Sequence, residues 1–480
     1  MIGTHAGAMS QLKSDVKQAY GLSKTVVNFL LFIAGMAFVS AILTWGEKPG
    51  RLVFTGTTIV VATCFMVLYV FLFQFHREVL HVTRKVFFLL ITIILFAGVT
   101  KFVAGLQEKN FIFLIPFAVI PIIIRTFYDA RLAMMILLIT LVLCGFLVPQ
   151  PFEFIFVTFV SGIAAVFTLK KVYRKSRLFF TSFIIIVTYT VVWTGISLMK
   201  NGMLPDNFAR TFFLFTANGL LVLISFPLIF LFEQDFLLLS DATLIELTDT
   251  TQPLLRKFAE DAPGSFQHAL QVSNLAEEAA RVIGANYLLV RTGALYHDIG
   301  KIGNPKYFVE NQGDEISPHE NLDPKESARM IISHVRNGVN LAKNYKLPIQ
   351  IIDFIRMHHG TTIAYYFYKK FLDQNPGEVP GPGSEKPFTY PGPKPFSKET
   401  AVVMMADAIE AASRSLTNFN EEAISELVER IIYLQEQDGQ FSDVPLTFKD
   451  MSDIKDVFKR RMSNIYHARI VYPDRTNAYQ

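Results

Sequence analysis

The sequence is poor in charge and in cysteine. Only 18% of its 480 residues are charged and only two are cysteines, whereas phenylalanine alone supplies 45. Soluble proteins average about 25% charged residues, so the composition excludes an ordinary soluble enzyme of even composition. Cys64 and Cys144 both lie in apolar runs, which excludes a disulfide framework and a cysteine-based metal site. The apolar content of 51% excludes a disordered chain.

The charges that are present divide the chain into two unlike halves. Residues 1–232 hold 19 Lys and Arg against 7 Asp and Glu, a balance of +12. Residues 233–480 hold 26 against 34, a balance of −8. This asymmetry indicates two regions in different solvents. We therefore expect a membrane domain over residues 26–232, followed by a water-soluble region.

The first half contains repeated apolar runs that are long enough to cross a bilayer, which needs about 20 residues per helix. We predict eight spans. The fourth is short and carries Pro116 and Pro121, so we expect it to be kinked or merged with a neighbour. The predicted spans are residues 26–45, 52–75, 86–105, 111–124, 132–148, 152–169, 178–198 and 211–232.

Basic residues between these spans fall mostly on one side of the membrane. The N-terminal tail, residues 1–25, and the second, fourth and sixth loops together hold 13 Lys and Arg, whereas the alternate loops hold six. Because cytoplasmic loops are enriched in such residues, we expect a multi-pass cell-membrane protein with both termini in the cytoplasm. The dense cluster at 170–177 is interpreted as a topology signal, and no nucleic-acid polymer is expected as a partner.

The predicted spans contain no acidic residue in their interiors. The seven acidic residues of this half all lie at or outside span ends: Asp15, Glu47, Glu78, Glu108, Asp129, Glu153 and Asp206. Ionisable residues inside a membrane usually mark an ion path. The pattern therefore favours an anchor or a sensor over a transporter.

After the last span the sequence changes to amphipathic helical patterns. In residues 266–283 apolar side chains recur at helical spacing, and Gly284 is expected to end that helix. Residues 233–262 are expected to be connecting helices that lead into a domain over residues 263–480. Few stretches alternate as strands do, so the predicted fold class is all-α, a polytopic membrane domain followed by an all-helical cytoplasmic domain.

Six of the ten histidines lie between positions 268 and 359: His268, His297, His319, His334, His358 and His359. A lone histidine is more often a surface or core residue than a metal ligand, but a cluster changes this expectation. In the strongest pattern, His297-Asp298 closes a helix just before Gly300-Lys301, and His358-His359-Gly360 has the same form. A carboxylate can bridge two cations while imidazoles occupy the outer positions, so we predict a histidine and carboxylate metal site.

These residues, and the sequence around them, resemble the HD-domain metal phosphohydrolases in the form that binds two metals. The resemblance covers nearly all of residues 240–416 and is most specific to the seven-transmembrane-receptor HD family, the PgpH-type cyclic di-AMP phosphodiesterases of the bacterial inner membrane. The segments that carry it are residues 262–268, 296–301, 331–335, 358–361, 390–395 and 405–407.

The resemblance implies a centre that holds two divalent transition-metal ions. One ion would be held by His268, His297, Asp298 and Asp407, and the other by Asp298, as the bridge, with His334, His358 and His359. Mixed imidazole and carboxylate ligation suits Mn²⁺ or Fe. Apolar residues surround Asp407 in the sequence, and a buried carboxylate needs a charge partner, which a metal supplies.

Two such cations would activate a water for in-line attack on a phosphodiester. Asp298 is accordingly expected to be catalytic as the bridge. Lys301 is expected to be catalytic and substrate-binding by offsetting phosphate charge, with a solvated lysine as the alternative. His319 lies in a loop that the family places beside the active site, and we expect it to be substrate-side or structural.

The resemblance implies a membrane-anchored phosphodiesterase that hydrolyses the second messenger cyclic di-AMP to pApA, with the dinucleotide and the lipid bilayer as partners. A cyclic di-GMP phosphodiesterase and a non-catalytic membrane nucleotide receptor remain alternatives, and self-association is left open. Cyclic di-GMP enzymes of the HD class show Glu after the histidine pair and a later Gly-Tyr-Pro. This chain has Gly360-Thr361-Thr362 and lacks that tripeptide. The intact set of metal ligands makes a non-catalytic receptor the less favoured alternative.

The chain departs from the family pattern in two places. Family members carry a large extracellular domain after the first span, whereas residues 46–51 alone separate the first two predicted spans here. Sensing by such a domain is therefore not expected. The second departure is residues 374–386, a Pro- and Gly-rich insert that we expect to be a flexible loop near the mouth of the site, with an SH3-type ligand as the alternative.

Overall fold

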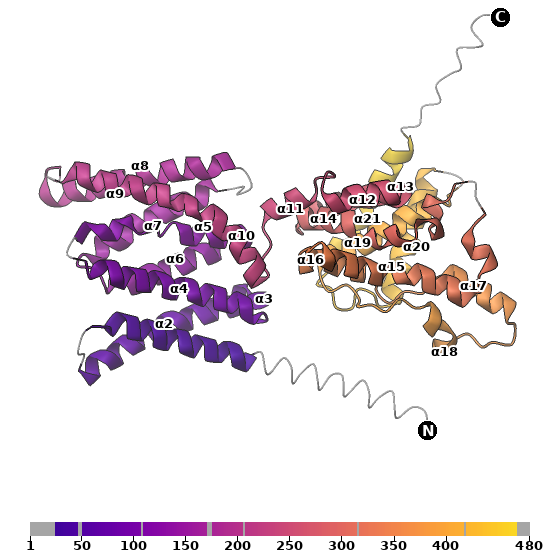
Figure 1. The fold of residues 1–480 in the computed structure, drawn as a ribbon, viewed down its shortest axis with the longest axis horizontal. Coiled ribbons are helices and arrows are strands. Elements are labelled where there is room, and N and C mark those ends of the chain that lie inside the picture. Colours follow the sequence, from indigo (N-terminus) through magenta and orange to yellow (C-terminus); the bar gives the residue numbers. More distant parts are fainter. Residues whose placement is uncertain are drawn as a thin grey trace, which may run out of the picture. The chain divides into compact units, whose positions relative to one another are not determined.

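A computed structural model describes residues 25–46, 50–106, 109–169, 175–204, 207–313, 316–416 and 419–467 of the chain. Within these ranges the regular elements are all helices, and the one β contact is an isolated bridge between Ile363 and Thr389 (Figure 1). The all-α prediction is confirmed. The predictions made for residues 1–24, 47–48, 108, 170–174 and 206 lie outside the described residues.

The described helices form two compact units, which divide between Ala242 and Thr243. Each unit has its own hydrophobic core. The first unit contains the helix Thr25–Thr44, α2 (Arg51–Phe75), α3 (Arg77–Leu80), α4 (Thr83–Ala104), η1 (Lys109–Leu114), α5 (Val119–Phe127), α6 (Ala130–Gly145), α7 (Pro151–Thr168), α8 (Lys175–Asn201), α9 (Phe208–Leu221), η2 (Val222–Ile224) and α10 (Ser225–Phe236).

Seven helices among the described residues are long and apolar enough to cross a membrane, which makes this a multi-pass membrane protein. Large apolar side chains such as Leu52, Phe102 and Phe213 are exposed on their outer faces. A helix that is apolar all round is typical of a membrane span, because lipid covers the faces that water would otherwise meet.

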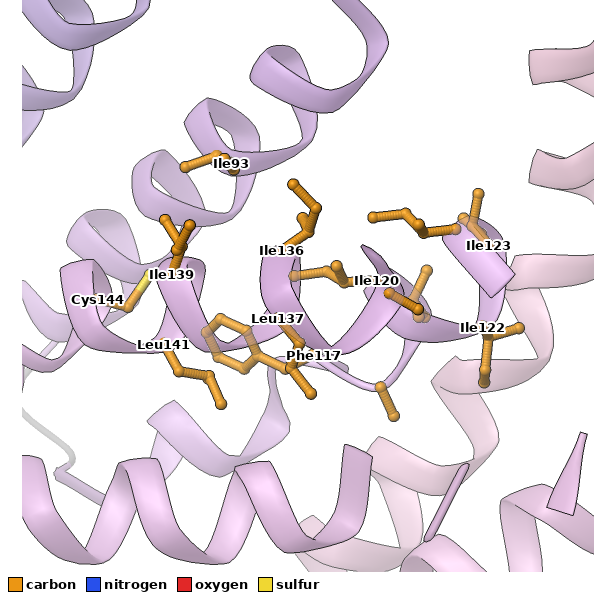
Figure 2. Packing of buried hydrophobic residues seen from close by; sticks show 14 of the residues in the cluster. Ile93, Phe117, Ile120, Ile122, Ile123, Ile136, Leu137, Ile139, Leu141 and Cys144 are labelled. Carbon is orange, nitrogen blue, oxygen red and sulfur yellow. The ribbon is translucent and has the colours of Figure 1, made fainter. Parts of the chain in front are cut away.

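The remaining predicted span corresponds to α6, which has only 16 residues. Its length is about 24 Å, whereas the hydrocarbon core is about 30 Å thick. Ten residues of α6 are buried, and Figure 2 shows its side chains gathered with Ile93 of α4 and Ile120 of α5. It therefore lies in the centre of the unit, and the count of eight crossings stays a prediction.

The fourth predicted span is interrupted at Pro116, as its two prolines suggested. The 3₁₀ helix η1 ends at Leu114 and α5 begins at Val119. Asn218 of α9 donates hydrogen bonds from Nδ2 to the carbonyl oxygens of Phe113 and Ile115, both at 2.8 Å. Within lipid, backbone groups freed by a proline must be satisfied by a neighbouring helix, and Asn218 provides this.

The second unit contains helices α11 to α21. Its α-helices are α11 (Asp241–Leu247), α12 (Pro253–Asp261), α13 (Pro263–Val282), α14 (Tyr287–Tyr296), α15 (Pro324–Asn344), α16 (Ile349–Met357), α17 (Tyr365–Gln374), α18 (Pro382–Glu385), α19 (Lys398–Ser413), α20 (Glu421–Gln437) and α21 (Phe448–His467). Five short 3₁₀ helices join them: η3 (Ile299–Gly303), η4 (Pro305–Tyr307), η5 (Val309–Asn311), η6 (Pro318–Asn321) and η7 (Lys386–Phe388).

The core of this unit is formed mainly by α13, α14, α19, α20 and α21. As predicted, Gly284 follows the end of α13, where its φ of +68° suits a residue without a Cβ atom. The Pro- and Gly-rich insert is more ordered than expected, because it includes α18. Buried Ser384 explains this order: its hydroxyl accepts a hydrogen bond from the Gly381 N–H at 3.2 Å.

Candidate metal centre

The second unit brings seven polar side chains from five helices or helix ends into one cluster. His359 is partly buried and the other six are buried. Their ligand atoms fall into three overlapping groups, each within 4.8 Å. The cluster consists of His268 from α13, His297 and Asp298 from the end of α14, His334 from α15, His358 and His359 from the end of α16, and Asp407 from α19.

The adjacent residues His297 and Asp298 face one site because α14 ends at Tyr296, just before them, as the sequence predicted. His297 caps α14 with helical dihedral angles, whereas Asp298 has a φ of −108° and a ψ of 11° and leads into η3. Neighbouring residues inside a helix diverge by about 100°. The change of backbone direction lets both side chains reach the same centre.

Three of the histidines are oriented by backbone carbonyl groups one turn earlier. The Nδ1 atom of His297 donates to Ala294 O at 2.6 Å, and that of His334 donates to Ile331 O at 2.6 Å. The Nδ1 atom of His358 lies 2.9 Å from the Ile355 carbonyl oxygen. A proton held at Nδ1 leaves the lone pair at Nε2, so each ring presents a ligand atom to the cluster.

Two glycines allow these elements to approach closely. A Cβ atom at Gly300 in η3 would lie 1.9 Å from the His334 carbonyl oxygen of α15. A Cβ atom at Gly293 in α14 would lie 2.3 Å from the ring of Phe354 in α16. Real Cβ contacts are never this short. The cluster therefore depends on backbones packed more tightly than any other residue type would permit.

The two oxygens of Asp298 face different histidines. Its Oδ2 lies 3.3 Å from His297 Nε2 and 3.7 Å from His268 Nε2. Its Oδ1 lies 3.4 Å from His334 Nε2 and 3.6 Å from His358 Nε2. Because the oxygens of one carboxylate point to two sets of nitrogens, this side chain has the geometry of a bridge between two cation positions.

Asp407 completes the side of the cluster that faces α13 and α14. Its Oδ1 lies 2.8 Å from His268 Nε2 and 3.5 Å from His297 Nε2, and its Oδ2 lies 3.8 Å from His359 Nδ1. We refer to the space between the two carboxylates, His268 and His297 as the first position. We refer to the space between Asp298, His334, His358 and His359 as the second position.

The charges of the cluster are set by burial and by mutual contacts. Burial opposes ionisation of Asp298, but Lys301 and His297 outweigh it and hold the pKa of Asp298 well below its usual range. Burial would also lower the pKa of His297, yet Asp298 and Asp407 raise that pKa to about 10. The first position therefore attracts positive charge, which a bound cation would supply in place of the His297 proton.

The second position has the opposite character. Burial lowers the pKa of His334 and holds the pKa of His358 well below its usual range, with the neighbouring histidines adding to the effect on His358. Burial likewise lowers the pKa of His359 to about 3. These three imidazoles are therefore neutral at pH 7, which is the form that binds metal.

Two buried atoms test whether this donor set fits a metal. Within the described part of the chain, His297 Nε2 and Asp298 Oδ1 are buried and have no hydrogen-bond partner. An unsatisfied buried polar atom costs about 1–3 kcal/mol, and more when it is charged. Imidazole nitrogen and carboxylate oxygen are transition-metal ligands, so a cation beside these atoms would satisfy both. The residues fit the metals that the resemblance implied.

Lys301 lies against the cluster in a buried ion pair. Its Nζ is 2.7 Å from Asp298 Oδ2 and 2.8 Å from Glu310 Oε1, and Ser265 Oγ donates to the same Glu310 oxygen at 2.7 Å. Burial would lower the pKa of Lys301, but the two carboxylates raise it above its usual range. The solvated alternative for Lys301 is therefore wrong.

His319 does not join the seven side chains. Its Nε2 donates to the Tyr307 carbonyl oxygen at 2.9 Å, and its ring centroid lies 4.9 Å from that of Phe367. These contacts attach η6 to its neighbours. Its substrate-side role stays a prediction.

Two residues that support the cluster, Glu310 and Glu410, escaped the sequence analysis. Glu310 holds Lys301, and Glu410 pairs with His268. Tyr390, which lies in one of the segments that carry the resemblance, has its ring 4.2 Å from that of His359. Glu410 could have been found, because it follows Asp407 by three residues and so shares its helix face. Glu310 gave no such signal, because it lies in a segment without periodic pattern.

A cavity of about 420 Å³ opens beside the cluster. Its polar wall includes His268, Lys301 and Asp407, and an apolar wall includes Met404 of α19 and Leu434 of α20. Small-molecule sites commonly occupy 300–1,000 Å³ and combine an apolar lining with a few polar groups. The cavity therefore suits a ligand that carries both a charged group and an apolar group.

Comparisons with known proteins give separate matches for the two halves that the charge distribution indicated. Residues 51–240 match the family described as 7TM receptor with intracellular HD hydrolase, and residues 265–412 match the HD domain. The second match includes all seven clustered residues.

Two curated relatives are named cyclic-di-AMP phosphodiesterase PgpH. The protein from Bacillus subtilis is 36% identical over 383 residues, which is 77% of this chain and 53% of the relative. The protein from Listeria monocytogenes is 35% identical over 369 residues, or 76% and 51% of the two chains. This chain thus spans about half the length of the curated relatives it matches. A crystal structure of the Listeria monocytogenes PgpH HD domain in complex with cyclic-di-AMP is 42% identical, with a TM-score of 0.43, and the match covers 46% of this chain and all of that one.

Proposed function

This chain belongs to the family of seven-transmembrane receptors with an intracellular HD hydrolase, and from that membership we propose that it is a membrane-anchored phosphodiesterase that opens cyclic di-AMP to linear pApA. The observation that carries the proposal is the carboxylate of Asp298, whose two oxygens face separate sets of histidines. The names of the two curated relatives support the choice of substrate.

We assign the seven clustered residues to two divalent metal positions. His268, His297, Asp298 and Asp407 would hold one ion, and His334, His358, His359 and the shared Asp298 the other. Mn²⁺ and Fe both suit this donor set. When bound, two such ions supply an activated water and neutralise phosphate charge during in-line attack. The protein residues hold the donors in place through the Nδ1 contacts and the close packing described above.

Lys301 and Glu310 form the part of the site that meets the phosphate. Both line the cavity, and Glu310 holds the ammonium group independently of Asp298. An ammonium group fixed at the cavity wall can donate to a phosphate oxygen, and such charge-assisted hydrogen bonds are about twice as strong as neutral ones. We therefore assign Lys301 to binding of the phosphate that is cleaved.

The apolar wall of the cavity supports a nucleobase as the rest of the substrate. Ala408 and Ala411 lie one turn apart on α19, and Ile431 and Leu434 have the same spacing on α20. Together these four side chains give the cavity an apolar wall. We assign this wall to a base of the dinucleotide.

Gly360 favours cyclic di-AMP over the cyclic di-GMP alternative. The sequence signature of cyclic di-GMP enzymes places Glu after the histidine pair, which is this position. Gly360 has a φ of +50°, and a Cβ atom there would lie 2.3 Å from Gln440 Oε1. Gln440 in turn accepts a hydrogen bond from the Thr361 N–H at 3.1 Å. A glutamate would be strained in this backbone and would displace the glutamine.

We further propose that both termini lie in the cytoplasm, with α6 counted as the eighth crossing. Contacts within the first unit support this orientation. They indicate that the basic second and fourth loops and the end of the last span lie on the same side of the membrane. His76 Nε2 of the second loop lies 3.3 Å from Asp129 Oδ1 of the fourth. Arg84 donates from Nη1 to the Asp235 carbonyl oxygen at 3.5 Å.

The test of the proposed activity uses the full chain, purified in detergent and supplied with Mn²⁺. We expect pApA from cyclic di-AMP with the wild-type protein and none with Asp298→Asn, which weakens the bridge. The matched control is Asp353→Asn, because Asp353 is also a largely buried carboxylate but pairs with Arg356 on α16. Hydrolysis by Asp298→Asn at the wild-type rate, or no pApA from the folded, metal-loaded wild type, contradicts the proposal.

A further inference from the structure

Glu410 lies between a clustered histidine and an arginine. It is on α19, one turn after Asp407, and is only 4% exposed. Its Oε2 accepts a hydrogen bond from His268 Nδ1. Arg414, which follows four residues later and caps the C-terminal end of α19, donates from Nη2 to Oε1 at 2.9 Å and to Oε2 at 3.1 Å. The arrangement is a continuous chain from arginine through carboxylate to imidazole.

His268 differs in this respect from three other histidines of the cluster. The Nδ1 atoms of His297, His334 and His358 all meet backbone carbonyls of their own helices. His268 is on α13, and its Nδ1 meets a side chain from α19. Its orientation therefore depends on one replaceable residue of another helix.

We propose that Glu410 is a positioning residue for the first metal position, an inference that rests on the two-metal centre of the proposed function. A carboxylate can only accept, so Glu410 holds the His268 proton at Nδ1 and leaves the lone pair of Nε2 toward Asp407 and Asp298. Arg414 fixes the carboxylate through paired hydrogen bonds. Outer partners of this kind usually contribute 10- to 100-fold to metal affinity.

Glutamine at position 410 separates this role from simple packing. Glu410→Gln keeps the size of the side chain and replaces one acceptor oxygen by an NH₂ donor. When that group faces His268, the imidazole must accept at Nδ1 and carry its proton at Nε2, where it can no longer bind a cation. The variant should therefore lose metal affinity while keeping the helix contacts.

The experiment is a Mn²⁺ titration of the full chain in detergent, read by isothermal calorimetry and by bound metal after desalting. We expect the wild type to bind about two ions and Glu410→Gln to bind one of them about 10- to 100-fold more weakly. The matched control is Glu277→Gln. Glu277 pairs with Arg281 at the same i, i+4 spacing and with Arg291, and it is not one of the clustered residues.

Wild-type affinity for both ions in folded Glu410→Gln would overturn the inference, and so would an equal loss in Glu277→Gln. If Glu410→Gln does not fold, Arg414→Gln is tested in its place. We then expect weaker binding of the same ion. Unchanged binding would contradict the positioning role of Glu410. A wild type that binds two ions but leaves cyclic di-AMP intact refutes only the proposed activity. A wild type that binds no Mn²⁺ refutes both.

Discussion

Replacing Gly300 by alanine should dismantle the metal centre without changing any of its ligands. Gly300 lies in η3, two residues after Asp298, where the turn packs against the backbone of α15. The added Cβ atom would lie 1.9 Å from the His334 carbonyl oxygen and 2.5 Å from the Gly338 nitrogen. Both are backbone atoms inside a helix, so no side-chain rotation can relieve the contact.

The required displacement follows from these distances. Ordinary contact begins at 3.4 Å, so η3 and α15 must separate by more than 1 Å. Asp298 Oδ1 and His334 Nε2, now 3.4 Å apart, lie on the two elements that must separate. Metal–ligand distances vary by only about 0.2 Å in working sites. We expect loss of at least one bound metal and a fall in hydrolysis of more than 100-fold, and overpacking of this kind costs about 1–3 kcal/mol or more in stability.

The assay compares Gly300→Ala with Gly303→Ala in the full chain. Gly303 is three residues later in η3, and a Cβ atom there has nothing within 4 Å. Metal content, the rate of pApA formation and thermal unfolding are measured for both variants. Gly303→Ala should match the wild type. If Gly300→Ala keeps the metal content and the rate of pApA formation of the wild type, close backbone approach at Gly300 does not hold the centre together.

Two further predictions concern single charged side chains. Lys301→Met should raise KM for cyclic di-AMP about 10- to 100-fold, because a hydrogen bond to a charged group contributes about 1.5–3 kcal/mol; an unchanged KM argues against phosphate binding. Asp450→Asn should destabilise the start of α21 by about 1 kcal/mol at pH 7, because Asp450 forms a capping box with Thr447. Lys398 and the Thr447 N–H lower the Asp450 pKa to about 2. The stability that the Asp450 carboxylate adds is therefore complete above the pKa of unfolded Asp, about 3.9. It is lost as the pH falls toward 2. The measurement is the rate of backbone hydrogen exchange in the first turn of α21, in Asp450→Asn and in the wild type. The difference between the two rates should shrink as the pH falls from about 3.9 toward 2. A difference that does not change with pH contradicts this prediction.

The sequence predicted most of the helical architecture because local signals determine it. Gly284, for example, follows the end of α13, as the helical pattern at 266–283 predicted. The length of α6 was overestimated, because the apolar run continues beyond the helix to Val148, where the chain turns toward α7. Hydropathy shows which residues avoid water, but it does not show where an apolar helix ends.

The seven residues that the structure brings together were all named from the sequence. The histidine cluster and the His297-Asp298 pair stood out by pattern, and the family resemblance supplied the complete set. The contacts around the seven residues were not predicted. Glu410 reaches His268 across 142 positions of the chain, and Glu310 reaches Lys301 from a segment without periodic pattern. The approach of Gly300 to α15 depends on tertiary packing. The sequence pattern shows which residues can bind a metal. The contacts that orient those residues come from distant parts of the chain and are seen only in the folded structure.

The most direct test of the proposed substrate is the ratio of kcat/KM for cyclic di-AMP to that for cyclic di-GMP, measured on the full chain with Mn²⁺. The backbone at Gly360, which departs from the signature of cyclic di-GMP enzymes, predicts that cyclic di-AMP is preferred and that pApA is the product. Equal turnover of the two dinucleotides, or a preference for cyclic di-GMP, would contradict the account.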